Sequence, residues 1–266
     1  MINNLKTHKN QPMIHIRAIP SLADNYIWLV TFGDHQAVVV DPAEAGPVLD
    51  VLNTENLDLK GILITHQCFD HVGGINSIVS HYPAPVYGPA SEPIPGMTHP
   101  LREGNAVNIG ATTFSVLDTP GHTAGHIVFY GGGVLLCGDL LFAAGCGRVH
   151  TRRPDWMFES LGKIKQLPQE TRVYCAHEYT LANLKFAHAV EPDNADIIKR
   201  QHVEQKKRQR GLATVPFTLN EELLTNPFLR CNVPAVKAAA EKFSGQPLSS
   251  EAEVFRIIRD WKDTFA

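Results

Sequence analysis

Short apolar runs separated by turn residues fill the first two thirds of the chain. The runs NYIWLVTF, AVVVDP, GILITH, TTFSVLDTP, HIVFY, GVLLCGD and RVYCAHE are rich in Val, Ile and Phe and are bounded by Gly, Pro or Asp. This pattern predicts β-strands. Helical spacing appears between them, roughly over residues 44–53, 72–81 and 154–166, and the last stretch begins at a proline, which suits the first turn of a helix. An α+β fold is therefore expected here.

The pattern changes after Tyr179. The strand-like runs stop, and LANLKFAHAV, NADIIKRQHVEQKKRQR, VPAVKAAAEKF and EAEVFRIIRDWKDTF carry apolar residues at helical spacing. We expect a boundary near residue 178, with a first domain over residues 14–178 and a helical domain over 179–266. Residues 1–13 are expected to form a polar N-terminal extension.

Composition narrows the class of protein. The 266 residues are 44% hydrophobic and 19% charged, which suffices for a full core. The net charge of −3 does not favour binding to nucleic acid or to a membrane surface. The basic run Lys199–Arg210 lacks interleaved aromatic residues, so we expect a solvated helix face there. No apolar run approaches the roughly 18 residues of a membrane-spanning helix.

The N-terminus and the cysteines favour a cytoplasmic protein. The segment MINNLKTHKNQPMIH has no apolar region of the kind that a secretory signal needs. The five cysteines are odd in number and scattered, which is typical of a reducing compartment rather than of a disulfide framework. We also expect a monomer rather than an oligomer.

Six imidazole or carboxylate side chains follow the predicted strands closely. They are His66, Asp70, His71, His122, Asp139 and His177. Taken singly, each is typical of a loop or a cap, but the ordered set favours convergence at one edge of a sheet. Imidazoles and carboxylates together suit Zn²⁺, Fe or Mn, and a shared carboxylate can hold two ions. His126 and His150 are expected to lie outside this set.

These motifs resemble the metallo-β-lactamase superfamily, whose signature is T-H-x-H-x-D-H, and within it the glyoxalase II family of hydroxyacylglutathione hydrolases. The similarity extends from about Ile16 to Phe265 and includes DNYIWLV, VVDP, THQCFDHVGG, VYGP, TPGHTAGH, LLCGDLLFAAGCGR, CAHEYTLANLKFA and RDWKDTF. The last two segments are the most specific, because many superfamily members share the metal motif. The resemblance implies a four-layer αβ/βα metallo-β-lactamase sandwich with a C-terminal helical domain.

The resemblance also implies a centre for one or two metal ions, zinc first and iron or manganese as alternatives. The first ion would be bound by His66, the residue at position 68 and His122. The second would be bound by Asp70, His71 and His177. Asp139 would bridge the two ions, and Asp70 and Asp139 would also fix the attacking hydroxide as catalytic residues.

Position 68 departs from the family pattern, because Cys68 stands where the signature has its second histidine. Three outcomes stay open. The thiolate replaces the imidazole as a zinc ligand, or the cysteine does not bind and the first site is weak or empty, or the cysteine has a redox role.

The implied reaction is hydrolysis of S-D-lactoylglutathione to D-lactate and glutathione by metal-bound hydroxide, a step of methylglyoxal detoxification. The chain has no G-x-S-x-G nucleophile motif. Glutathione is acidic, so its site needs cations and hydrogen-bond donors. By position, the resemblance assigns this role to Arg148, Tyr179, Arg259 and Lys262.

Two further departures concern the substrate side. His150 stands where a tyrosine or phenylalanine is common, and Leu140 replaces a threonine. Two other functions stay open. One is a mononuclear iron sulfur dioxygenase acting on glutathione persulfide through His66, His122 and Asp139. The other is a glutathione-binding protein with weakened catalysis.

Overall fold

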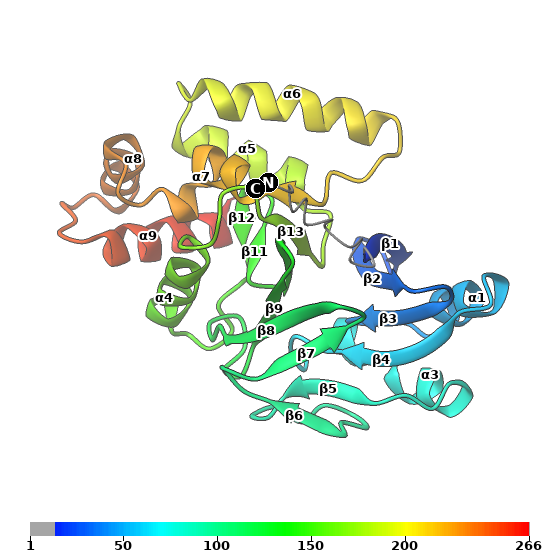
Figure 1. Ribbon diagram of the computed structural model, residues 1–266. Helices are drawn as coiled ribbons and strands as arrows, with labels where there is room; N and C mark the ends of the chain where they lie inside the picture. The colour runs from blue at the N-terminus through cyan, green and yellow to red at the C-terminus, as the bar shows by residue number, and fades with distance from the viewer. Residues whose placement is uncertain (1–13, 266) are drawn as a thin grey trace, which may run out of the picture.

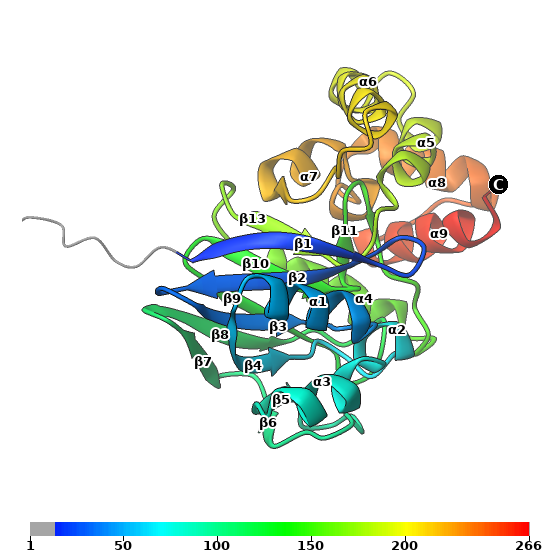
Figure 2. The same ribbon diagram turned by 90° about the vertical axis from the view of Figure 1, so that its right-hand side faces the viewer.

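The computed structural model describes residues 14–265 and shows two six-stranded sheets packed face to face, with helices outside them (Figures 1 and 2). The strands of the first sheet lie in chain order: β1 (His15–Ser21), β2 (Asn25–Phe32), β3 (Gln36–Val40), β4 (Asp58–Leu63), β5 (Val86–Pro89) and β6 (His99–Leu101). β1 to β3 pair antiparallel, and β3 to β6 pair parallel. The parallel connections carry the helices α1 (Gly46–Thr54), α2 (Phe69–Val72) and α3 (Ile75–His81).

The second sheet has the order β14-β13-β10-β9-β8-β7. Its strands are β7 (Ala106–Ile109), β8 (Thr112–Asp118), β9 (Ile127–Gly131), β10 (Val134–Gly138), β13 (Arg172–Cys175) and β14 (Phe217–Thr218). β10 and β13 pair parallel, and the connection between them contains the hairpin β11 (Leu141–Phe142) and β12 (Gly145–Cys146) and the helix α4 (Pro154–Ile164).

Alternation along β2 explains how one strand serves two layers. Trp28 and Val30 belong to the core between the sheets, whereas Ile27 and Leu29 pack into the core under α1 and α3. Because successive side chains of a strand point to opposite faces, a strand covered on both faces is apolar at nearly every position. The expected four-layer sandwich is thereby confirmed.

Helices of the C-terminal segment lie above one end of the sandwich (Figure 1). They are α5 (Thr180–Val190), α6 (Ala195–Gln209), α7 (Leu219–Thr225), a 3₁₀ turn (Pro227–Leu229), α8 (Pro234–Ser244) and α9 (Glu251–Thr264). α7 and α9 begin with capping boxes at Thr218 and Ser250, which satisfy the free amides of their first turns. Across residues 14–265, none of the helices has the length and hydropathy to cross a bilayer.

Three expectations about local structure were wrong. The helix expected over 72–81 is divided at Gly73 and Gly74, where the backbone passes so close to Ala43 and Glu44 that a Cβ atom would lie 2.6–2.7 Å from their atoms. Asp70 and His71 lie within the short helix α2, before this division.

The other two errors concern the C-terminal segment. A strand does occur after Tyr179, because the two residues of β14 extend the second sheet beside β13, and two residues are too few to show a period. The basic run of α6 is not wholly solvated, since Arg200 is buried and pairs with Glu222 at 2.6 Å. The boundary near residue 178 stays a prediction, and residues 1–13 lie outside the described part of the chain.

Candidate metal centre

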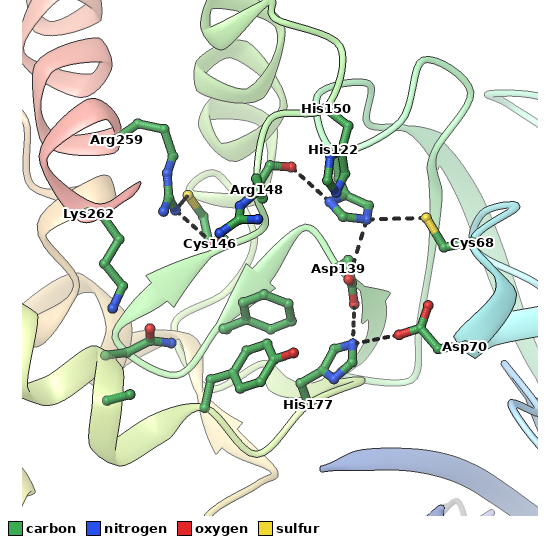
Figure 3. A pocket seen from close by; sticks show the side chains of 14 residues that line it. Cys68, Asp70, His122, Asp139, Cys146, Arg148, His150, His177, Arg259 and Lys262 are labelled. Carbon is green, nitrogen blue, oxygen red and sulfur yellow. Dashed lines mark hydrogen bonds and ion pairs between the residues drawn. The ribbon is translucent and has the colours of Figure 1, made fainter. Parts of the chain in front are cut away.

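The six side chains expected at the strand ends meet in one place. His66, Asp70 and His71 come from the segment after β4, His122 from the loop between β8 and β9, and Asp139 and His177 from the residues after β10 and β13. Figure 3 shows Asp139 between His122 and His177, with Cys68 and Asp70 together on one side of these three residues. The ends of strands from both sheets thus deliver imidazoles and carboxylates to a single cluster.

The separations within the cluster fit ligands that share a cation. His122 Nε2 lies 3.4 Å from Asp139 Oδ2, and His177 Nε2 lies 3.3 Å from Asp70 Oδ2 and from Asp139 Oδ1. Hydrogen bonds between nitrogen and oxygen are usually about 2.7–3.2 Å long. Two ligands bound at about 2.0–2.2 Å to a tetrahedral ion lie about 3.4 Å apart.

Buried atoms without a hydrogen-bond partner point into the same space. Among the described residues these include His66 Nε2, His71 Nε2 and Asp139 Oδ1. A buried polar atom without a partner is costly unless something else satisfies it. These atoms and the distances above fit one or two divalent cations bound by the cluster.

Carboxylates hold the second nitrogen of two of the imidazoles. His71 Nδ1 lies 3.1 Å from Asp41 Oδ2, and His177 Nδ1 lies 2.8 Å from Asp24 Oδ1. Asp41 also accepts hydrogen bonds from the amide and the hydroxyl of Thr65. A carboxylate on Nδ1 fixes the ring and the tautomer, leaving Nε2 free to bind a metal ion.

Neutral groups hold the other two imidazoles. His66 Nδ1 lies 3.0 Å from Thr65 Oγ1, and His122 Nδ1 lies 2.8 Å from the carbonyl oxygen of Arg148. All four rings therefore use Nδ1 for support and direct Nε2 toward the cluster. The strength of that support differs between the two pairs of histidines.

His126 lies outside the candidate ligand groups, although it is buried beside them. Burial lowers its pKa to about 3, so the ring is neutral. Its Nε2 accepts a hydrogen bond of 3.2 Å from the amide of Asp139. His126 therefore positions the backbone of Asp139.

The ionisable side chains of the cluster shift one another's pKa values. The neighbouring imidazole of His177 lowers the pKa of Asp70 to about 2. Burial opposes the charged form of His177, yet the neighbouring carboxylates of Asp139 and Asp70 raise the pKa of its imidazole to about 10. Burial lowers the pKa values of His66 and His122 instead. Burial opposes ionisation of Asp139, but the neighbouring His71 and His177 hold its pKa well below the usual range. Both carboxylates are therefore ionised, as metal binding would require.

Cys68 belongs to this cluster by position. Its Sγ lies 3.6 Å from His122 Nε2, and the ligand atoms of His66, Cys68 and His122 all lie within 4.8 Å of one another. A second such group contains Asp70, His71 and His177. Burial, and then the charge of Asp139, raise the pKa of the Cys68 thiol to about 12.

A pocket of about 460 Å³ opens beside the cluster (Figure 3). Arg148, Tyr179, Arg259 and Lys262 all line it, so the structure brings the four expected substrate residues together with the candidate metal ligands. Figure 3 shows the cationic side chains of Arg259 and Lys262 at the end of the pocket away from Cys68.

Contacts fix the side chains on the cationic side. Arg259 is buried, donates to the carbonyl oxygen of Cys146 at 3.2 Å and pairs with Asp263 at 2.8 Å. The ring of Tyr179 stacks on that of His177 with a centroid distance of 4.7 Å. Tyr179 therefore lies on the wall of the pocket, directly against one of the candidate metal ligands.

His150 and Leu140, the two departures from the family pattern on the substrate side, lie in different environments. His150 lines the pocket, and its ring centroid is 4.9 Å from that of His122, so it is not remote from the cluster. Leu140 is fully buried in the main core.

Sequence reasoning missed the supporting residues Asp24, Asp41, Thr65 and Glu92. Asp24 and Asp41 stand within the motifs DNYIWLV and VVDP, which could have drawn attention to them as loop carboxylates. Thr65 likewise begins the motif THQCFDHVGG, whereas Glu92 lies in none of the quoted motifs and its role depends on contacts formed only in the fold.

Two family models together match most of the chain. The model described as metallo-beta-lactamase superfamily matches residues 22–177, and that described as hydroxyacylglutathione hydrolase C-terminus matches residues 178–265. A hydroxyacylglutathione hydrolase of Alkalilimnicola ehrlichii is 51% identical, covering 94% of this chain and 99% of its own. One from Nitrosomonas europaea is 48% identical, covering 95% and 97%.

Solved structures share the fold. ETHE1 from Myxococcus xanthus superposes with a TM-score of 0.64 at 23% identity, covering 93% of this chain and 90% of its own. TTHA1623 in a di-iron-bound form has a TM-score of 0.57 at 28% identity, covering 81% and 100%. The two family models and the relatives of about half identity show that the chain belongs to the hydroxyacylglutathione hydrolase family of the metallo-β-lactamase superfamily.

Proposed function

We propose that this protein hydrolyses glutathione thioesters, with S-D-lactoylglutathione as the substrate and D-lactate and glutathione as products. The observation that carries the proposal is a cluster of metal-ligand side chains at one end of a pocket whose other end is cationic. Relatives of about half identity over nearly their whole length are named for this activity.

Six side chains would hold the metal: His66, His122, Asp70, His71, His177 and the bridging Asp139. Their mixed nitrogen and oxygen atoms suit zinc, iron or manganese. Divalent cations of this kind lower the pKa of a coordinated water and polarise a carbonyl oxygen.

The side chains of this chain orient the reactants. Asp70 and Asp139 are ionised and accept hydrogen bonds from the attacking water. Water contributes its oxygen and one hydrogen to the acyl carbon, the carbon–sulfur bond breaks, and the other hydrogen ends on the glutathione sulfur.

Glutathione lies, in this proposal, against the cationic end of the pocket. Arg259 and Lys262 face its carboxylates, and Arg148 stands at the exposed rim of the pocket. Tyr179 holds the peptide backbone of glutathione beside His177. Charge-assisted hydrogen bonds of this type are about twice as strong as neutral ones. Binding of glutathione at the cationic end fixes the thioester carbonyl beside the candidate metal ligands.

The test compares three reactions of the metal-loaded protein. Loss of the thioester is followed with S-D-lactoylglutathione and with the same acyl group on coenzyme A, and oxygen uptake is followed with glutathione persulfide. We expect rapid hydrolysis of the glutathione thioester only. Oxygen uptake without hydrolysis would support the iron dioxygenase instead, and glutathione binding without either reaction would support a non-catalytic binding protein.

We also propose that the protein acts as a monomer in the cytoplasm. All five cysteines are free in the structure, which suits a reducing compartment.

A further inference from the structure

The two halves of the candidate centre differ in their donor atoms. His66, Cys68 and His122 form one half, here called the sulfur half, and Asp70, His71 and His177 form the other, here called the carboxylate half. The inference below rests on the proposed metal-dependent function and assigns a metal preference to each half.

The position of the Cys68 sulfur agrees with metal ligation. Bond lengths to zinc of about 2.3 Å for sulfur and 2.0–2.1 Å for nitrogen place two tetrahedral ligands about 3.6 Å apart. Cys68 Sγ lies 3.6 Å from His122 Nε2. Figure 3 shows the sulfur of Cys68 directed toward His122.

A buried carboxylate sets this spacing. Glu92 is only 6% exposed, and its two oxygens accept hydrogen bonds from the amide of Gln67 at 2.6 Å and from that of Gly125 at 2.9 Å. Gln67 precedes Cys68, and Gly125 belongs to the loop that carries His122. One side chain therefore ties together the two loops that bring sulfur and imidazole within reach of one ion.

The support behind the two halves differs in charge. In the carboxylate half, Asp41 and Asp24 lie against the Nδ1 atoms of His71 and His177. In the sulfur half the corresponding partners are a hydroxyl and a carbonyl oxygen. Carboxylate support raises the basicity of an imidazole ligand. Carboxylate ligands suit manganese, whereas thiolates select softer ions such as zinc.

We infer that Cys68 is a metal ligand and that it makes the sulfur half selective for thiophilic ions. Zinc and cobalt fill both halves of the centre, whereas manganese fills the carboxylate half alone. The chain has thereby exchanged an imidazole for a thiolate without losing its first site.

Cobalt spectroscopy of the full chain tests this inference. A thiolate bound to cobalt(II) gives a charge-transfer absorption in the near ultraviolet that imidazole and carboxylate ligands do not give. We expect this band in the wild-type protein, its loss in Cys68→Ser, and a fall in bound cobalt from about two ions per chain to about one. Cys231→Ser is the matched control, since Cys231 is buried away from the pocket and should leave the band unchanged.

Metal loading gives a second readout. Elemental analysis after loading with manganese should find about one ion per chain in the wild type and about two in Cys68→His. That variant also shows that position 68 can change without loss of folding. Two cobalt ions without the band would overturn the inference and leave the hydrolase proposal standing. Failure to bind any metal would contradict the hydrolase proposal itself.

Discussion

His177 Nδ1 lies 2.8 Å from Asp24 Oδ1, although the two residues are 153 positions apart in the chain. Asp24 comes from the turn between the first two strands and His177 from the end of β13 in the other sheet. The contact joins the two sheets beside the candidate metal ligands. It also fixes the His177 ring, whose Nε2 faces Asp70 and Asp139.

Replacing Asp24 tests the importance of this support. In Asp24→Asn the amide keeps the shape of the side chain but removes the charge behind His177. We expect metal affinity to fall by about 10–100-fold, as is usual when an outer-shell carboxylate is lost. Competition with a chromogenic chelator measures it. Asp155→Asn, at an exposed pair with Arg153, is the matched control, and an equal fall in both variants would contradict the account.

Metal binding should release protons at neutral pH. Without a metal ion, the pKa of His177 is raised to about 10, so its ring carries a proton at pH 7 that metal ligation must displace. Apparent metal affinity should therefore rise as the pH increases from 7 toward 10. Calorimetry in two buffers of different ionisation enthalpy measures the release. Identical binding heats in both buffers would show that no proton leaves.

Glu222 holds the hairpin beside the pocket. It is fully buried, pairs with Arg200 at 2.6 Å, and accepts hydrogen bonds from the amide of Ala144 at 2.9 Å and from Asn226 at 2.7 Å. In Glu222→Gln, Arg200 keeps a buried charge without its partner. We expect the free energy of unfolding to fall by about 3 kcal/mol or more.

Denaturant unfolding of the metal-free protein measures this loss. Asp260→Asn breaks the exposed pair with Arg256 and serves as the control, with an expected change below about 1 kcal/mol. A loss for Glu222→Gln no larger than that of the control would show that the buried pair does not stabilise the hairpin.

Lys262 should contribute to binding rather than to chemistry. Burial, and then the neighbouring Arg259, lower the pKa of its ammonium group, which lines the pocket at the cationic end. In Lys262→Met we expect KM for S-D-lactoylglutathione to rise about tenfold or more with kcat little changed, since one charge-assisted bond is lost. Steady-state kinetics measure both. Lys237→Met, on an exposed face of α8, should change neither; a fall in kcat alone would contradict this role.

The convergence of the six candidate ligands could be predicted from the sequence because they follow apolar strands in order. The same reasoning could not find Glu92, whose role lies in contacts with the amides of Gln67 and Gly125. Strand β14 escaped detection because its two residues are too short for any period. Short local patterns predict the strands, whereas supporting contacts depend on the packing of distant loops.

Metal removal and restoration decide whether hydrolysis of the thioester depends on ions bound by the ligand cluster. The protein is stripped with a chelator, dialysed, and titrated with zinc while hydrolysis of S-D-lactoylglutathione is followed. We expect no hydrolysis without metal, and recovery of the rate in step with bound zinc up to two ions per chain. Hydrolysis that persists in the metal-free protein, or a fully loaded protein that does not hydrolyse this thioester, would contradict the proposed function.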